Sequence, residues 1–168
     1  MRNQIAIKIL QQLLRNSKKS DRELAKAIGV SQATFTRRRK QLEKKIIQEY
    51  TIIPNLYELG FEILAFTFIR IREPKEDFRE KARQFLTKCP NVIFASGGDG
   101  LGMEALAISV HKDYTSYISF ISEARMEWTG IILDIQSFLV SLKGDFETKP
   151  FSMKPLADIL PMVVQKKL

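Results

Sequence analysis

The chain has 168 residues, 45% of them hydrophobic, and a formal net charge of +8 at pH 7. These values allow one mid-sized domain or two small ones with proper cores, and the polar start and interrupted apolar runs predict a cytoplasmic protein without signal peptide or membrane span. The single cysteine, Cys89, excludes an intrachain disulfide and a metal site built on several cysteines.

Three helices are predicted at the start of the chain. Apolar residues recur at helical spacing over residues 3–15, which predicts a first amphipathic helix. Ser20 and Glu23 fit a capping box that starts a second helix, and Gly29 can adopt the left-handed conformation that ends it. Ser31, two residues later, is a preferred N-cap for a third helix. This short turn between two helices is typical of a helix-turn-helix.

The positive charge is concentrated in the same region. Residues 1–50 contain 13 Lys and Arg against 4 Asp and Glu, a balance of 13 − 4 = +9. The remaining 118 residues hold 27 − 13 = 14 cations and 19 − 4 = 15 anions, a balance of −1. A solvated basic face without a partner is the alternative, but the coincidence of charge and turn motif favours a domain that binds double-stranded DNA.

The third helix is interpreted as the recognition helix. Phe35 and Leu42 are seven residues apart and are expected to face the bundle, which turns other positions toward solvent. The first residues of such a helix meet base edges in the major groove, and basic residues also meet phosphates. Arg39 is expected to lay its stem over the core and extend its head toward a phosphate. The predicted DNA-binding residues are Ser31, Gln32, Ala33, Thr34, Thr36, Arg37, Arg38, Lys40, Lys44 and Lys45.

The segment after these helices is expected to leave the bundle as a wing. Residues 46–53 are rich in β-branched side chains and end at Pro54, which predicts a strand. A winged helix-turn-helix domain is therefore predicted over residues 1–53. Residues 54–60 are typical of a linker, and residues 61–168 are expected to form the second domain.

From residue 61 the pattern alternates between strands and helices. Four strands are predicted, at residues 63–71, 92–96, 103–110 and 131–142. Two helices are predicted between them, at residues 78–89 and 114–124. The order βαββαβ is that of a ferredoxin-like domain with both helices on one face of an antiparallel sheet, so the fold class is α+β. The first strand is apolar on both faces, but the two helices can cover only one face of the sheet. A second copy of the chain is the simplest partner for the other face, which predicts a homodimer or higher oligomer.

These elements resemble the Lrp/AsnC family, the leucine-responsive or feast/famine transcriptional regulators of bacteria and archaea. The similar parts are the helix-turn-helix from Leu24 to Ser31, the helix end and wing from Leu42 to Thr51, the Pro54-Asn55 linker and the βαββαβ unit. The resemblance covers about residues 3–145. It implies a winged helix-turn-helix that binds DNA and a dimerising (RAM-type) domain whose interfaces bind amino acids or other small effectors. It thus implies a sequence-specific transcriptional regulator that is not an enzyme.

The resemblance also implies an effector site at a glycine-rich turn of the second domain, formed by Gly98, Asp99, Gly100, Leu101 and Gly102. The extra glycines and Glu104 depart from the family's usual Gly-Asp turn, which predicts a weak response to ordinary amino acids. A phosphate-binding loop is a weaker interpretation of the same glycines, because no Gly-Lys-Ser/Thr follows and the next element is a predicted strand.

Two other functions stay open. A sirohaem-decarboxylase-like enzyme has the same two-domain plan, but its chemistry calls for clustered histidines and arginines, and His111 is the only histidine. His111 is expected at the surface, and no metal, cofactor or catalytic residue is predicted. A carboxylate pair drawn from Asp99, Glu104 and Asp134 lacks a partner base. An effector-binding assembly protein with a vestigial helix-turn-helix is opposed by the +9 balance of residues 1–50.

Overall fold

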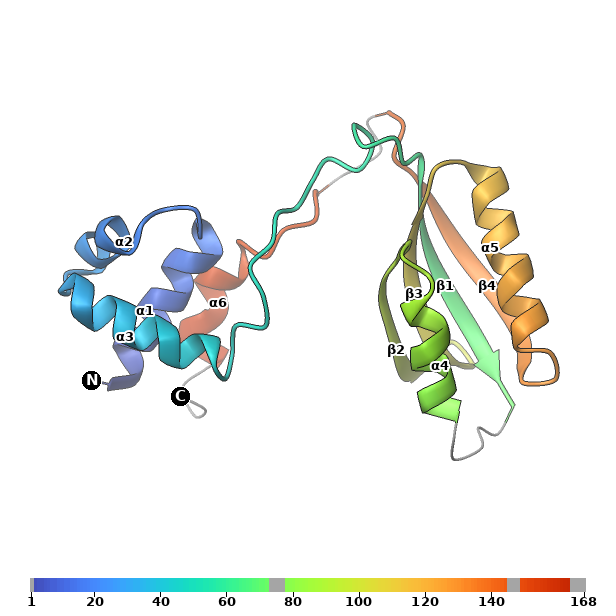
Figure 1. Cartoon of the computed structure of the whole chain (residues 1–168), viewed down its shortest axis with the longest axis horizontal. Coiled ribbons are helices and arrows are strands. Elements are labelled where there is room, and N and C mark those ends of the chain that lie inside the picture. Colours follow the sequence, from blue (N-terminus) through green and yellow to red (C-terminus); the bar gives the residue numbers. More distant parts are fainter. Residues whose placement is uncertain (1, 73–77, 145–148, 164–168) are drawn as a thin grey trace. The chain divides into compact units, whose positions relative to one another are not determined.

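A computed structural model of the chain describes residues 2–72, 78–144 and 149–163. Two compact units are distinguished, the first made of Met1–Ile53 and Lys149–Leu168 and the second of Pro54–Thr148 (Figure 1). This division differs from the expected one in two respects. The expected linker, residues 54–60, belongs to the second unit, and the segment from Lys149 onward belongs to the first.

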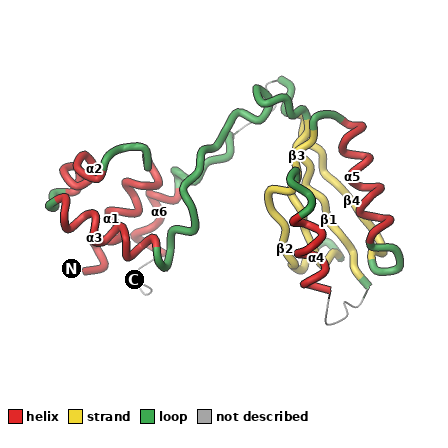
Figure 2. The backbone as a smooth tube through the Cα atoms, in the orientation of Figure 1, coloured by secondary structure: helices red, strands yellow, loops and turns green. Residues whose placement is uncertain are grey.

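In the described part of the chain, the first unit is built from helices (Figure 2): α1 (Arg2–Arg15), α2 (Asp21–Ile28), α3 (Gln32–Glu43) and α6 (Leu156–Val163). The predicted capping box starts α2, since Ser20 Oγ accepts from Glu23 N at 3.3 Å and Glu23 Oε2 accepts from Ser20 N at 2.8 Å. Gly29, with φ of 74°, ends it in the left-handed conformation. The predicted helix-turn-helix is confirmed.

The core of the first unit lies where α1, α2 and α3 meet. Ile9, Leu24 and Phe35 come one from each of these helices, and their side chains are almost completely buried. Ala25, also buried, lets α2 and α3 approach closely because its side chain is small. Phe35 and Leu42 both face this core as predicted, so the opposite side of α3 is free to meet another molecule.

Residues 46–53 form no strand, and the prediction of a wing strand is wrong. The backbone N–H groups of Lys45, Ile46 and Ile47 all donate to Leu42 O, at 3.2, 2.8 and 3.0 Å, and close α3 with a tight turn. The chain then continues without regular structure to Ile53. β-Branched residues favour a strand only where a neighbouring strand can pair with it, and the surroundings of this segment in the first unit are helical.

Helix α6 packs on α1, far away in the sequence. Pro161 lies inside α6 and has no N–H, so Ala157 O lacks the usual helical donor four residues later. Gln11 of α1 replaces that donor: its Nε2 lies 2.8 Å from Ala157 O. Arg15 Nη2 lies 2.9 Å from Asp158 Oδ1, and Ala157 is completely buried. The proline thus exposes a carbonyl that a side chain of α1 satisfies.

The second unit is a four-stranded antiparallel sheet in the order β2-β3-β1-β4 with two helices. Its elements are β1 (Ile63–Ile71), α4 (Phe78–Thr87), β2 (Val92–Gly100), β3 (Met103–His111), α5 (Tyr114–Glu127) and β4 (Ile132–Ser141). The predicted βαββαβ order and the α+β fold class are confirmed. No helix in the described ranges has the length and apolar character needed to cross a bilayer.

Both helices of the second unit cover the same face of the sheet (Figure 1). Ala65 of β1 is buried in a cluster with Tyr117 and Ile121 of α5. Phe78 and Phe85 of α4 place their ring centroids 5.3 and 5.8 Å from that of Trp128, which follows α5. Because side chains alternate along a strand, the residues between the helix-facing ones point to the other face.

That other face, here called the open sheet face, is apolar. The strand register brings its side chains together as cross-strand pairs: Phe66 opposes Ile108 on one side and Phe138 on the other. Phe138 remains 67% exposed. The apolar residues of the open sheet face are Leu64, Phe66, Phe68, Phe94, Leu106, Ile108, Val110, Phe138 and Val140.

Candidate nucleic-acid interface

The outer side of α3 forms a shallow hollow lined by side chains that recur every three or four residues, as one face of a helix requires. We call this face the recognition surface. Its residues are Gln32, Ala33, Thr36, Arg37, Lys40, Gln41 and Lys44. It combines amides that can pair with base edges, a methyl group for thymine and cations for guanine or phosphate.

Six of the ten residues predicted to contact DNA line the recognition surface: Gln32, Ala33, Thr36, Arg37, Lys40 and Lys44. Ser31 and Thr34 instead form the N-cap of α3, with Ser31 Oγ accepting from Thr34 N at 3.2 Å. Arg38 lies off this face, and its Nη1 donates to Gln41 Oε1 at 2.8 Å. Lys45 lies in the turn after α3. Gln41 also lines this face and was not predicted, although it follows Arg37 by four residues, the spacing that places both side chains on one face of a helix.

The cations of the recognition surface have no ion-pair partner among the residues that the structure describes. Arg37, Lys40 and Lys44 make no ion pair with any residue in the described ranges. All three side chains are exposed on one face of a single helix, so their charges add in the same direction. An exposed row of unpaired cations is the feature that attracts the phosphates of a duplex.

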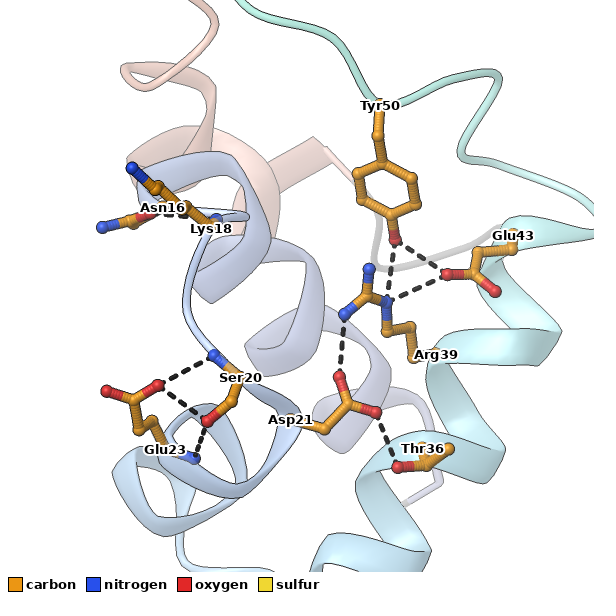
Figure 3. Close-up of polar contacts among 9 residues, drawn as sticks. All are labelled: Asn16, Lys18, Ser20, Asp21, Glu23, Thr36, Arg39, Glu43 and Tyr50. Carbon is orange, nitrogen blue, oxygen red and sulfur yellow. Dashed lines mark hydrogen bonds and ion pairs between the residues drawn. The ribbon is translucent and has the colours of Figure 1, made fainter.

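Arg39 does not extend toward solvent as expected but is held inside a polar cluster (Figure 3). Its Nη1 lies 2.7 Å from Asp21 Oδ1, and its Nε lies 2.9 Å from Glu43 Oε1 and 3.1 Å from Tyr50 Oη. The guanidinium also lies 4.8 Å from the centroid of the Tyr50 ring, a cation–π distance. The other oxygen of Asp21 accepts from Thr36 Oγ1 at 2.6 Å.

The charges of this cluster compensate one another. Burial alone would raise the pKa of Asp21, but hydrogen bonds from Thr36 and Arg39 outweigh it and hold the pKa below its usual value. Burial and the hydrogen bond to Glu43 raise the pKa of Tyr50 above its usual value, so its hydroxyl keeps the proton that it donates to Glu43. The two carboxylates near the recognition surface are thus paired with Arg39, and they do not cancel the free cations beside them.

The five residues of the implied effector site lie at the β2–β3 hairpin. The sequence predicted that β2 would end at Ser96, but the strand runs to Gly100 and the turn contains only Leu101 and Gly102. Both turn residues have positive φ, 56° and 67°, as the two-residue hairpin turns that match strand twist require. Gly98, Asp99 and Gly100 are therefore strand residues, which removes the loop that a phosphate site would need.

Two side chains from neighbouring strands tie this hairpin to β1. Arg70 Nε donates to Gly102 O at 2.8 Å, and Glu104 Oε2 accepts from Ile71 N at 2.7 Å. A Cβ added to Gly102 would lie 3.0 Å from Arg70 Nη2, at the end of a flexible side chain, so the positive φ of 67° is the stronger reason for glycine here. Glu104 thus has a structural partner, and Asp134 accepts from Gln136 at 2.9 Å.

His111 is buried, and the prediction of a surface histidine is wrong. It is 3% exposed, and its Nε2 lies 2.8 Å from Ser109 Oγ. His111 lies at the end of β3, opposite Ile63 of β1. The ring centroids of Tyr117 and Phe120 on α5 each lie 5.4 Å from that of the imidazole. Burial lowers the pKa of His111. The imidazole therefore packs as a neutral core residue.

Comparisons with known proteins agree with this architecture. A profile of the winged helix-turn-helix DNA-binding family matches residues 2–45. The chain is 31% identical over 124 residues to the HTH-type transcriptional regulator Ptr1 of Methanocaldococcus jannaschii, covering 73% of this chain and 81% of that one. It is 30% identical over 113 residues to the HTH-type transcriptional regulator LrpA of Pyrococcus horikoshii, covering 66% of this chain and 79% of the relative.

Solved structures share the fold over most of the chain. A transcriptional regulator of Neisseria meningitidis, solved as a complex with L-Met, superposes with a TM-score of 0.74 at 24% identity, covering 88% of this chain and 91% of the other. An AsnC family transcriptional regulator from Agrobacterium tumefaciens also gives a TM-score of 0.74, at 20% identity and with 88% and 92% of the two chains covered.

Proposed function

Because this chain belongs to the Lrp/AsnC family of DNA-binding transcriptional regulators, we propose that it binds operator DNA through the recognition surface and that it does so as a two-fold dimer. The observation that carries the first part is the row of unpaired cations on α3, Arg37, Lys40 and Lys44. Gln32 and Ala33, in the first turn of α3, are the residues proposed to meet base edges.

The proposed roles follow from the position of each side chain. Arg37 comes after the first turn and is able to pair with guanine, whereas Lys40 and Lys44 lie further along and are suited to phosphates. Thr36 already donates its hydroxyl to Asp21, so its methyl group is the part proposed to face a thymine. Ser31 and Thr34 are proposed to act as the cap that points the start of α3 at the groove.

The open sheet face supports the dimer. A continuous apolar surface that the helices of its own unit do not cover favours association with an identical surface about a two-fold axis. In such a dimer, two recognition helices are expected about 34 Å apart, which corresponds to inverted half-sites one helical turn apart. Binding and not catalysis is proposed as the activity, with the cytoplasm as its location.

A small effector is proposed at the β2–β3 hairpin, by analogy with the regulator of Neisseria meningitidis that was solved with L-Met. The turn offers only two residues between its strands, and Arg70 and Glu104 already bond to backbone groups there. A weak response to ordinary amino acids is therefore expected. Thermal-shift screening of the twenty amino acids tests this, since a ligand at a hundred times its dissociation constant stabilises the folded state by about 2.7 kcal/mol.

DNA binding is tested by selecting duplexes from a random pool with the full chain and then footprinting the selected sequence and the region upstream of the protein's own gene. An inverted repeat in the selected DNA is expected.

The dimer is tested by sedimentation of Phe138→Lys, which should become monomeric because it places a charge on the open sheet face. Met126→Lys on α5 is the matched control, since Met126 and Phe138 are similarly exposed, at 69% and 67%. A Phe138→Lys variant that stays dimeric would remove the open sheet face from the interface.

A further inference from the structure

The segment that leaves the recognition helix has few attachments to the first unit. From Gln48 to Ile53 its backbone makes no hydrogen bond with the backbone of any other residue that the structure describes. Ile47 packs against the helical core, and three residues later Tyr50 returns its side chain to α3. The side chain of Tyr50 therefore attaches this segment to α3.

Tyr50 contacts α3 in three ways. Its hydroxyl donates to Glu43 Oε1 at 3.0 Å and accepts from Arg39 Nε at 3.1 Å, while its ring lies against the Arg39 guanidinium. Only a hydroxyl on an aromatic ring can make all three contacts at once. Figure 3 shows the phenol pointing down from the departing segment onto the two α3 side chains.

The same guanidinium connects this contact to the rest of the DNA-binding unit. Arg39 reaches Asp21 at the start of α2, and Asp21 also holds Thr36 on the recognition surface. The side chain of Arg39 thus joins the departing segment, the recognition helix α3 and the preceding helix α2. The Arg39–Asp21 pair is largely shielded from water, with side chains 22% and 20% exposed, so its geometry is defined better than that of a surface ion pair.

We propose that Tyr50 is a positioning residue for DNA recognition: by holding Arg39 and Glu43, it fixes the direction in which the chain leaves the recognition helix. In a two-fold dimer this direction sets how far apart the two recognition helices are held. Tyr50 thereby determines which half-site spacings the protein accepts, although it touches no base itself. This inference rests on the dimeric DNA-binding function proposed above.

The experiment measures spacing selectivity with the full chain. The operator selected by the wild-type protein is lengthened at its centre by one, two and five base pairs, five being about half a helical turn. The variant Tyr50→Phe keeps the ring and removes the hydroxyl. Tyr57→Phe is the matched control, because Tyr57 also follows α3 and its hydroxyl has no hydrogen-bond partner among the described residues.

Wild type and Tyr57→Phe should lose at least about tenfold in affinity when the half-sites are rotated apart, since dimeric readers follow the helical repeat. Tyr50→Phe should bind all four operators within about threefold of one another, with the slope of affinity against salt unchanged because no phosphate contact is removed. A merely destabilising substitution would lower the affinity for all operators and would leave their ranking intact.

Arg39→Lys provides the second measurement. If Tyr50 acts through Arg39, the double variant Arg39→Lys/Tyr50→Phe should have the same spacing profile as Tyr50→Phe alone. A spacing-selective wild type with an equally selective Tyr50→Phe would overturn the role of Tyr50 and leave the proposed function standing. A wild-type protein that binds without any spacing preference would instead overturn the dimeric operator, and this inference with it.

Discussion

Replacing Arg37, Lys40 and Lys44 together with alanine removes every exposed cation of the recognition surface. The three side chains make no ion pair in the described part of the chain, and alanine is the best helix former, so α3 should stay folded. Affinity for the selected operator should fall sharply, and its dependence on salt should become shallower because fewer counterions are released on binding.

The magnitude follows from the number of phosphates. Each phosphate contact contributes a slope of about 0.9 in log affinity against log salt, so the two lysines proposed to meet phosphates, Lys40 and Lys44, account for a slope of about 3.6 in a dimer. Between 50 and 200 mM salt, about 10²-fold of the wild-type loss of affinity should come from these two lysines alone. The triple variant should therefore lose that part of the salt dependence.

Fluorescence anisotropy with labelled operator across that salt range measures both quantities. The matched control is Lys88→Ala/Lys112→Ala/Arg125→Ala, which removes the same charge from exposed positions of the second unit. Arg38→Ala is a finer control, because Arg38 is bonded to Gln41 beside the recognition surface and should change the slope by less than about 0.5. If the triple variant kept the wild-type slope while the second-unit control lost it, the DNA would have to bind elsewhere.

Three further substitutions test the packing inside each of the two units. Ala157→Leu should destabilise the first unit by about 1 to 3 kcal/mol, since its position is completely buried against α1, and Trp128 fluorescence should report unchanged unfolding of the second unit. The second unit should lose stability as the pH falls below about 6.5, and His111→Gln should remove this loss. Burial lowers the pKa of His111 in the folded state, so only the unfolded chain takes up the proton in this pH range. Urea titrations at successive pH values measure the free energy of unfolding. Leu101→Asn should raise the melting temperature of the second unit, because asparagine accepts positive φ at a saving of about 1 kcal/mol; an unchanged or lower value would contradict the turn geometry.

Local signals predicted most of the fold. These signals act within a few residues of the chain, and each predicted the element that the structure has: the capping box at Ser20, the left-handed Gly29 and the strand periodicity of residues 63–71. The wing strand at residues 46–53 was predicted wrongly because side-chain propensity contains no information about whether a partner strand is near. The burial of His111 was missed for a similar reason, since α5 covers it only in the folded sheet.

The candidate site was predicted in part. Helical spacing from Phe35 gave most of the recognition surface, because a helix determines which side chains share a face. Helical spacing did not predict the polar cluster of Arg39, because its partners Asp21 and Tyr50 lie 18 and 11 residues away in the sequence. Opposite charges at such distances pair only once the helices have packed, so a sequence gives no signal for them beyond the presence of an acid at the start of α2.

The return of α6 to α1 means that the first unit is assembled from two separated pieces of chain. Residues 44–155, which include the whole second unit, lie between α3 and α6 in the sequence. At about 5 to 20 residues per second, a ribosome that has completed α3 needs on the order of ten seconds to synthesise α6. During that time Gln11 has no Ala157 carbonyl to bind, and the sheet of the second unit can fold before the first unit is complete. Newly made protein would thus complete its antiparallel sheet before its helical DNA-binding unit.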